Sequence, residues 1–159
     1  MWQRIQTVFL LIVILSLAAA LFFPVWLFHD QASGIMHQLF PLHYSTTEGG
    51  VNGELQMSNF FPYSLTGILA IAAITISLIE IRKFKDRVLQ MKLGALNSLF
   101  MAGTILCAVL FSNQLMKAHQ GGGYGLGLWL PGIAVVFNLL ANRFIRRDER
   151  LVRDSTRLR

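Results

Sequence analysis

The sequence is poor in the residues and motifs on which most enzymes depend. Its single cysteine, Cys107, lies in an apolar segment, where a thiol is expected to be buried and unreactive. One cysteine excludes an intrachain disulfide and a Cys-x-x-Cys redox pair. The phosphate-binding loop, the zinc-protease helix motif and the serine-hydrolase elbow are also missing. The sequence therefore indicates no catalytic residue and no cofactor, and it favours a non-enzymatic protein.

Charged residues are also scarce, at 14% of the chain against about 25% in average soluble domains, whereas 54% of the residues are hydrophobic. A chain of 159 residues is one domain by length, and a core of that size cannot hide so much apolar surface. The apolar residues fall into four runs of about the length that spans a bilayer. We therefore predict an all-α membrane protein, a bundle of four transmembrane helices. The single membrane domain 1–159 would have helices over about 5–28, 60–82, 92–116 and 124–147, an outer loop at 29–59 and a cytoplasmic tail at 143–159.

The first apolar run has two interpretations. Arg4, the apolar residues after it and the alanines at 18–20 are compatible with a cleaved signal peptide. The run continues through Trp26, however, well beyond the roughly 7–15 apolar residues of a signal sequence. We favour an uncleaved membrane anchor with Trp26 at the membrane interface.

The distribution of basic residues predicts the orientation of the chain. All 14 Lys and Arg residues except Lys117 lie before the first apolar run, between the second and the third, or after the fourth. Short cytoplasmic segments carry such an excess, so we expect both termini on the cytoplasmic side of a multi-pass protein. The net charge of +6 follows from this topology, and no nucleic-acid-binding motif accompanies it. No nucleic-acid partner is therefore expected.

The outer loop 29–59 carries a β-strand pattern. Val51, Leu55 and Met57 alternate with polar residues, and Gly49, Gly50 and Gly53 supply turn chemistry. This pattern predicts a β-hairpin over the outer end of the bundle, with its first strand interrupted or placed at an edge by Pro41. The four histidines, His29, His37, His43 and His119, are all expected on this outer side. Their spacing matches no metal-ligand pattern, so we predict no metal site.

Polar residues inside the apolar runs are the candidate interhelical contacts. Asn97 lies in the third run, and Asn138 and Asn142 share one face of the fourth because they are four residues apart. Small residues such as Gly94 allow close helix approach, and asparagine side chains bridge helices in membranes. Glu80 lies beside basic residues at the inner end of the second run, where it is expected to be paired or hydrated.

The tail is the candidate binding surface for a partner or for lipid. Apolar residues recur every seven positions there, and basic residues lie between them. One interpretation is a solvated helix with an apolar stripe, and the other is a helix that binds a partner protein or the lipid surface. The residues that would make this contact are Arg146, Arg147, Arg150, Leu151, Arg153 and Arg157.

Several segments together resemble a known family. They include 92–97 (Lys-Leu-Gly-Ala-Leu-Asn), 130–134 (Leu-Pro-Gly-Ile-Ala) and 145–149 (Ile-Arg-Arg-Asp-Glu). With these segments the chain resembles, over nearly its whole length, an uncharacterised family of small four-helix inner-membrane proteins from the Bacteroidetes, a domain of unknown function. The resemblance implies the bacterial inner membrane and implies no activity.

The predicted layout is also similar to the claudin-like plan of four helices and a β-containing first outer loop, by analogy of topology only. The Trp-x-x-Gly-Leu-Trp motif and the cysteine pair of that loop are absent from this sequence.

Two functions from different classes fit these observations. The favoured one is a non-enzymatic accessory or scaffold subunit of a larger inner-membrane assembly. It would sit in the lipid bilayer with a membrane-protein partner or further copies of itself. The alternative is a membrane enzyme or carrier that handles a lipid-like substrate between its helices.

Overall fold

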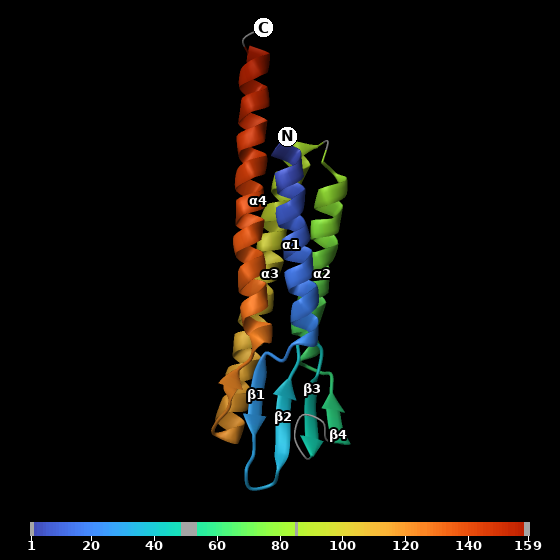
Figure 1. The fold of residues 1–159 in the computed structure, drawn as a ribbon, viewed down its shortest axis with the longest axis vertical. Coiled ribbons are helices and arrows are strands. Elements are labelled where there is room, and N and C mark those ends of the chain that lie inside the picture. The colour runs from blue at the N-terminus through green and yellow to red at the C-terminus, as the bar shows by residue number, and fades with distance from the viewer. Residues whose placement is uncertain (1, 49–53, 85, 158–159) are drawn as a thin grey trace.

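Four helices lie side by side in a bundle, and a β-sheet closes one end of it (Figure 1). A computed structural model of the chain describes residues 2–48, 54–84 and 86–157. The helices are α1 (Trp2–Phe22), α2 (Ser64–Arg82), α3 (Arg87–His119) and α4 (Leu126–Arg157). Each helix contacts two neighbours, in the cyclic order α1, α2, α3, α4. α1 begins and α4 ends on the side opposite the sheet, and α4 projects beyond the other helices there (Figure 1).

The sheet is antiparallel and has five strands in the order β4-β3-β2-β1-β5. They are β1 (Trp26–His29), β2 (Ile35–Leu39), β3 (Tyr44–Glu48), β4 (Glu54–Asn59) and β5 (Gly123–Tyr124). The first four follow one another along the chain as a meander. The fifth comes from the connection between α3 and α4 and pairs Tyr124 with Trp26. The sheet therefore joins the two segments of chain that cross this end of the bundle.

The predicted fold class, an all-α bundle of four transmembrane helices with one hairpin, is wrong. The sheet has five strands, and three helices of the described residues are long and apolar enough to cross a membrane: Ser64–Arg82, Arg87–His119 and Leu126–Leu151. The apolar part of α1, Ile5–Ala20, is shorter than the about 20 residues that a span needs.

The error in the first helix has a local cause. The apolar run continues to Phe28, but the helix ends at Phe22 because Pro24 disfavours helical backbone at the residue before it. The chain then becomes β1, whose Trp26 is fully buried between the sheet and α3. An apolar run thus covered a helix and a buried strand, which hydropathy alone does not separate.

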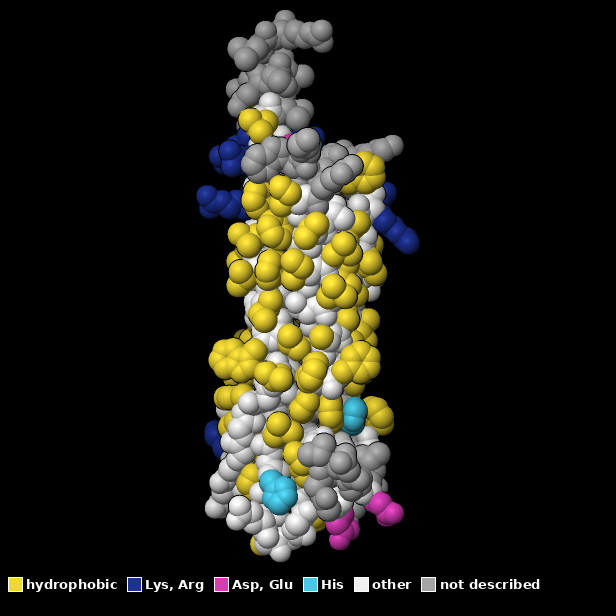
Figure 2. Space-filling view, viewed as in Figure 1, with side chains coloured by type: hydrophobic (Ala, Val, Ile, Leu, Met, Phe, Trp, Pro, Cys, Tyr) yellow, Lys and Arg dark blue, Asp and Glu magenta, His cyan; other side chains and the backbone are white. Residues whose placement is uncertain are grey.

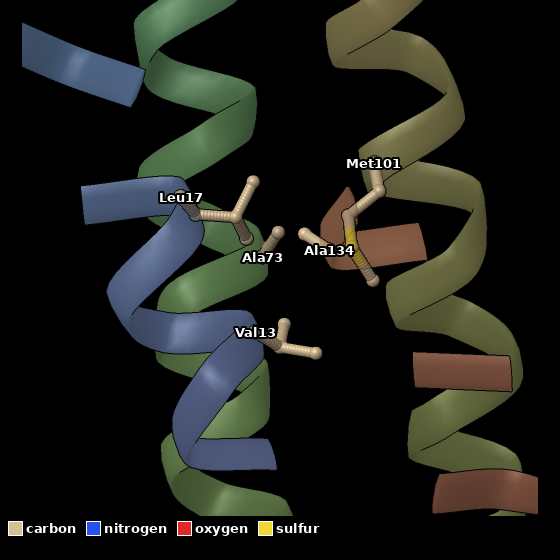
Figure 3. Close-up of a cluster of buried hydrophobic side chains, with 5 residues drawn as sticks. All are labelled: Val13, Leu17, Ala73, Met101 and Ala134. Atoms are coloured by element: carbon tan, nitrogen blue, oxygen red, sulfur yellow. The ribbon is translucent and has the colours of Figure 1, made fainter. Parts of the chain in front are cut away.

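The bundle core is small and lies where all four helices meet. Val13 and Leu17 of α1, Ala73 of α2, Met101 of α3 and Ala134 of α4 point toward one another and are fully buried (Figure 3). The two alanines leave room for the larger side chains, so the helices approach closely at this level.

The outer surface of the bundle is apolar. Hydrophobic side chains cover its middle, whereas Lys and Arg gather at the end away from the sheet (Figure 2). Leu15, Leu99 and Trp129, for example, are each at least 66% exposed. Large apolar side chains are thus exposed on the bundle, and three of its helices are long and apolar enough to cross a membrane, which places this protein in a membrane.

Candidate functional site

A buried hydrogen-bond network links α2, α3 and α4 inside the bundle. Asn97 of α3 is fully buried, and its Nδ2 donates to Ser77 Oγ on α2 at 2.7 Å. The same amide group approaches Asn138 Oδ1 on α4 at 3.5 Å. Ser77 in turn donates to the Ala73 carbonyl oxygen one turn earlier, at 3.0 Å. Asn97 of α3 therefore links a polar side chain of α2 to one of α4 in the apolar interior.

Asn138 makes the closer contacts of the network with α3. Its Nδ2 donates to the Gly94 carbonyl oxygen at 3.0 Å and to Ser98 Oγ at 2.9 Å. Both distances are in the range of good hydrogen bonds. In a bilayer such bonds hold helices together, because lipid offers the amide no alternative partner.

Asn142 lies one turn further along α4 and is not part of this network. Its amide packs over Gly94, where a Cβ atom would overlap it. The side chain is 8% exposed, and its Oδ1 is buried with no hydrogen-bond partner among the described residues. Glycine at position 94 is thus what lets α3 and α4 approach at this level.

Glu80 is buried near the end of α2 that lies away from the sheet. Its side chain is fully covered, and neither carboxyl oxygen has a hydrogen-bond partner in the described part of the chain. Only its backbone oxygen is engaged, by Gln90 Nε2 at 2.9 Å. The expected paired or hydrated position is therefore wrong: the helix turns Glu80 inward, away from the exposed Arg82 and Lys83.

The base of the projecting part of α4 is clamped to the start of α3. Arg87 Nη2 lies 3.1 Å from Asp148 Oδ2, and Arg87 Nη1 donates to the Asp148 carbonyl oxygen at 3.0 Å. Both side chains are largely shielded from solvent. A guanidinium that holds both the side chain and the backbone of one residue limits the directions that the helix can take.

A cluster of aromatic and histidine side chains joins the sheet to the end of α3. His37 Nδ1 on β2 lies 2.6 Å from the Tyr44 hydroxyl on β3, and His119 Nε2 lies 3.4 Å from the same hydroxyl. The two imidazole rings have centroids 4.3 Å apart. Burial lowers the pKa of His37, and the neighbouring His119 lowers it further, against an opposing effect of Asp30. Burial, with a smaller effect of Tyr63, raises the pKa of Tyr44 to about 12. Both shifts favour the uncharged forms of His37 and Tyr44.

Comparison with known families matched residues 2–158 to a domain of unknown function, DUF4293. The chain belongs to the DUF4293 family. The sequence resemblance to an uncharacterised family is therefore confirmed, over the whole described chain. A comparison with curated proteins found no relative of significant similarity.

In this DUF4293 protein, the predicted polar residues fall into two places. Asn97 and Asn138 meet in the interior, whereas Asn142 lines a groove near the basic end, together with Arg146, Arg147 and Arg150. Of the predicted tail residues, Leu151 is exposed, and the side chains of Arg153 and Arg157 lie outside the described residues.

The sequence analysis did not predict two features of this family member. One is the buried Glu80, and the other is the pairing of His37 with His119, which are distant in the chain. Among the residues that the structure describes, no group of three or more His, Cys, Asp or Glu side chains could hold a metal ion. Alternation along residues 35–39 places His37 on one face of a strand, but only the fold brings His119 to it.

Proposed function

We propose that this DUF4293 protein is a non-enzymatic accessory or scaffold subunit of a larger assembly in the bacterial inner membrane. The observation that carries the proposal is the length of α4. This helix continues beyond the other three as a single unbroken element (Figure 1). The helix backbone leaves the bundle there, and Leu151, the last residue whose side chain is described, is exposed and available to a partner.

Two further observations support a docking role for this segment. The Arg87–Asp148 clamp fixes its direction where it leaves the bundle. Exposed Arg150 and Leu151 follow the clamp directly, so a charged and an apolar contact are presented together. Arginine pairs well with carboxylates, which suits an acidic surface on a membrane-protein partner or on another copy of this chain.

The test of this function is to remove the segment beyond Arg150 and to compare assembly masses. This cut keeps Asp148 and its clamp but removes 151–159, including Arg153 and Arg157. We expect the truncated protein to insert into the membrane and to have the same melting temperature as the full-length chain. In native mass spectrometry of mild-detergent extracts, it should be detected at the mass of a single chain without partners.

A full-length Arg82→Gln/Lys83→Gln variant is the matched control, since it loses two exposed basic residues at the same end of the bundle. It should retain the assembly. If the truncated protein keeps the same assembly mass, the segment is no docking element. A full-length chain that is solitary and carries a stoichiometric lipid-like molecule would instead support the carrier or enzyme alternative.

We also propose that the basic end of the bundle, where both termini lie, faces the cytoplasm. The support is the concentration of Lys and Arg at that end, which short cytoplasmic segments favour. A cytoplasm-dependent reporter fused after Arg159 should be active, and one inserted at Gly50 should behave as periplasmic. Reversed activities would refute this orientation.

A further inference from the structure

The surface between α3 and α4 is hollowed near the basic end. This α3–α4 groove has a volume of about 1110 Å³. Its apolar part is formed by Val136, Leu139 and Leu140 of α4, which are exposed, and by the small Ala95 of α3. Because these side chains lie within the apolar segment Leu126–Leu151, this part of the groove opens to the hydrocarbon of the membrane.

The other part of the groove is strongly basic. Arg143, Arg146, Arg147 and Arg150 line it, and all four are exposed on the surface of α4. Their spacing of three or four residues places them on one face of the helix. No acidic side chain is among the described residues that line the groove. The nearby Asp148 pairs with Arg87 outside it.

The two parts of the groove follow each other along the helix axis. From Leu139 to Arg146 the rise is roughly 10 Å at 1.5 Å per residue, so apolar and basic parts lie at successive depths. Asn142 lies between them, more than nine-tenths buried, and its Oδ1 accepts no hydrogen bond from a described residue. A ligand that fits must be apolar at one end and anionic at the other, with a polar group between.

We propose that the α3–α4 groove binds one acidic phospholipid, such as phosphatidylglycerol. Its acyl chain lies along Leu139 and Leu140, its glycerol ester region lies at the level of Asn142, and its phosphate lies among the guanidinium groups. Arginine forms bidentate hydrogen bonds with phosphate oxygens. A zwitterionic lipid is a poorer fit because its ammonium group would face the same arginines. This site rests on membrane insertion. It shares Arg150 with the proposed docking surface, whose other residues lie beyond Arg150 and are removed by the truncation.

The test uses the purified full-length protein in mild detergent and native mass spectrometry with added lipid. Phosphatidylglycerol should bind with a stoichiometry of one, at least tenfold more tightly than phosphatidylcholine with the same acyl chains. Arg143→Gln/Arg146→Gln should weaken phosphatidylglycerol binding roughly 10- to 30-fold, since each basic residue near an anionic headgroup contributes about one factor of five. Ala95→Phe should also weaken it, because the ring occupies the apolar part without changing charge.

The matched control is Arg82→Gln/Lys83→Gln, which removes two exposed charges outside the groove. It should leave phosphatidylglycerol binding within about twofold of the wild-type value. The proposal is overturned if this control weakens binding as much as the groove variant, if Ala95→Phe has no effect, or if millimolar inorganic phosphate displaces the lipid. The last result would indicate a site for free anions. Truncation beyond Arg150 should not affect lipid binding, so this proposal and the scaffold function can fail separately.

Discussion

Gly127→Val is expected to lower the free energy of unfolding by about 3 kcal/mol or more, the upper range for overpacking. A Cβ atom at Gly127 would overlap the Phe23 carbonyl oxygen and lie 2.9 Å from the Pro24 carbonyl carbon. These are backbone atoms, which cannot rotate away. The glycine N–H also donates to the Pro24 carbonyl oxygen at 3.0 Å, so the start of α4 is held against the α1–β1 connection. Unfolding of the detergent-solubilised protein, followed by circular dichroism against denaturant, measures the loss.

Gly132→Ala is the matched control on the same helix. A Cβ atom there meets nothing within 4 Å. Alanine is a better helix former than glycine, so this variant should be unchanged or stabilised by up to about 1 kcal/mol. Equal destabilisation by both substitutions would show that α4 does not approach the α1–β1 connection as the structure has it.

Asn138→Leu should destabilise the bundle by about 2–3 kcal/mol. The substitution removes the donors to the Gly94 carbonyl oxygen and to Ser98 Oγ, and it leaves Asn97 without its partner on α4. Interhelical polar contacts in membranes are each worth up to about 1.7 kcal/mol, and stranded buried groups add to the cost. Thermal melting in detergent provides the measurement.

A double-mutant cycle separates the network from general packing. Ser98→Ala should couple to Asn138→Leu, because both variants break the same hydrogen bond. Ser112→Ala, also on α3, should be additive with Asn138→Leu, because Ser112 is buried at another level and has no hydrogen bond with Asn138. Additive effects for both serines would contradict a direct Asn138–Ser98 contact.

The apolar runs predicted where the chain meets lipid better than they predicted its secondary structure. α2, α3 and α4 fall within or overlap the runs that hydropathy marks. Hydropathy measures transfer to an apolar environment and does not distinguish lipid from a protein core. For that reason the sequence predicts Trp26 at the membrane interface, whereas its side chain is buried between the sheet and α3.

The sequence predicts only part of the β-sheet. The alternation around Leu55 and Met57 corresponds to β4, Glu54–Asn59. The sequence predicts a first strand that Pro41 interrupts or places at an edge, whereas Pro41 lies in the turn between β2 and β3. β5 has two residues, Gly123 and Tyr124, and no periodicity can be read from two positions.

For the candidate site, spacing decided only which side chains share a helix face. It placed Asn138 and Asn142 on one side of α4, but the structure gives them different surroundings. Glu80 illustrates the same limit. Its sequence position beside Arg82 indicates its depth along the helix axis, whereas the rotation of α2 against α3 determines that it points inward.

The sequence by itself determined the family, the apolar character of the helices and the concentration of basic residues outside the apolar runs, because each depends on composition along the chain. Only the tertiary structure decided which polar groups meet: Asn97 with Ser77 and Asn138, Asn138 with Ser98, and His37 with His119. These contacts join residues far apart in sequence. They depend on how four similar apolar helices rotate and pair, and a hydropathy pattern is nearly the same for every rotation of a helix that is apolar all round.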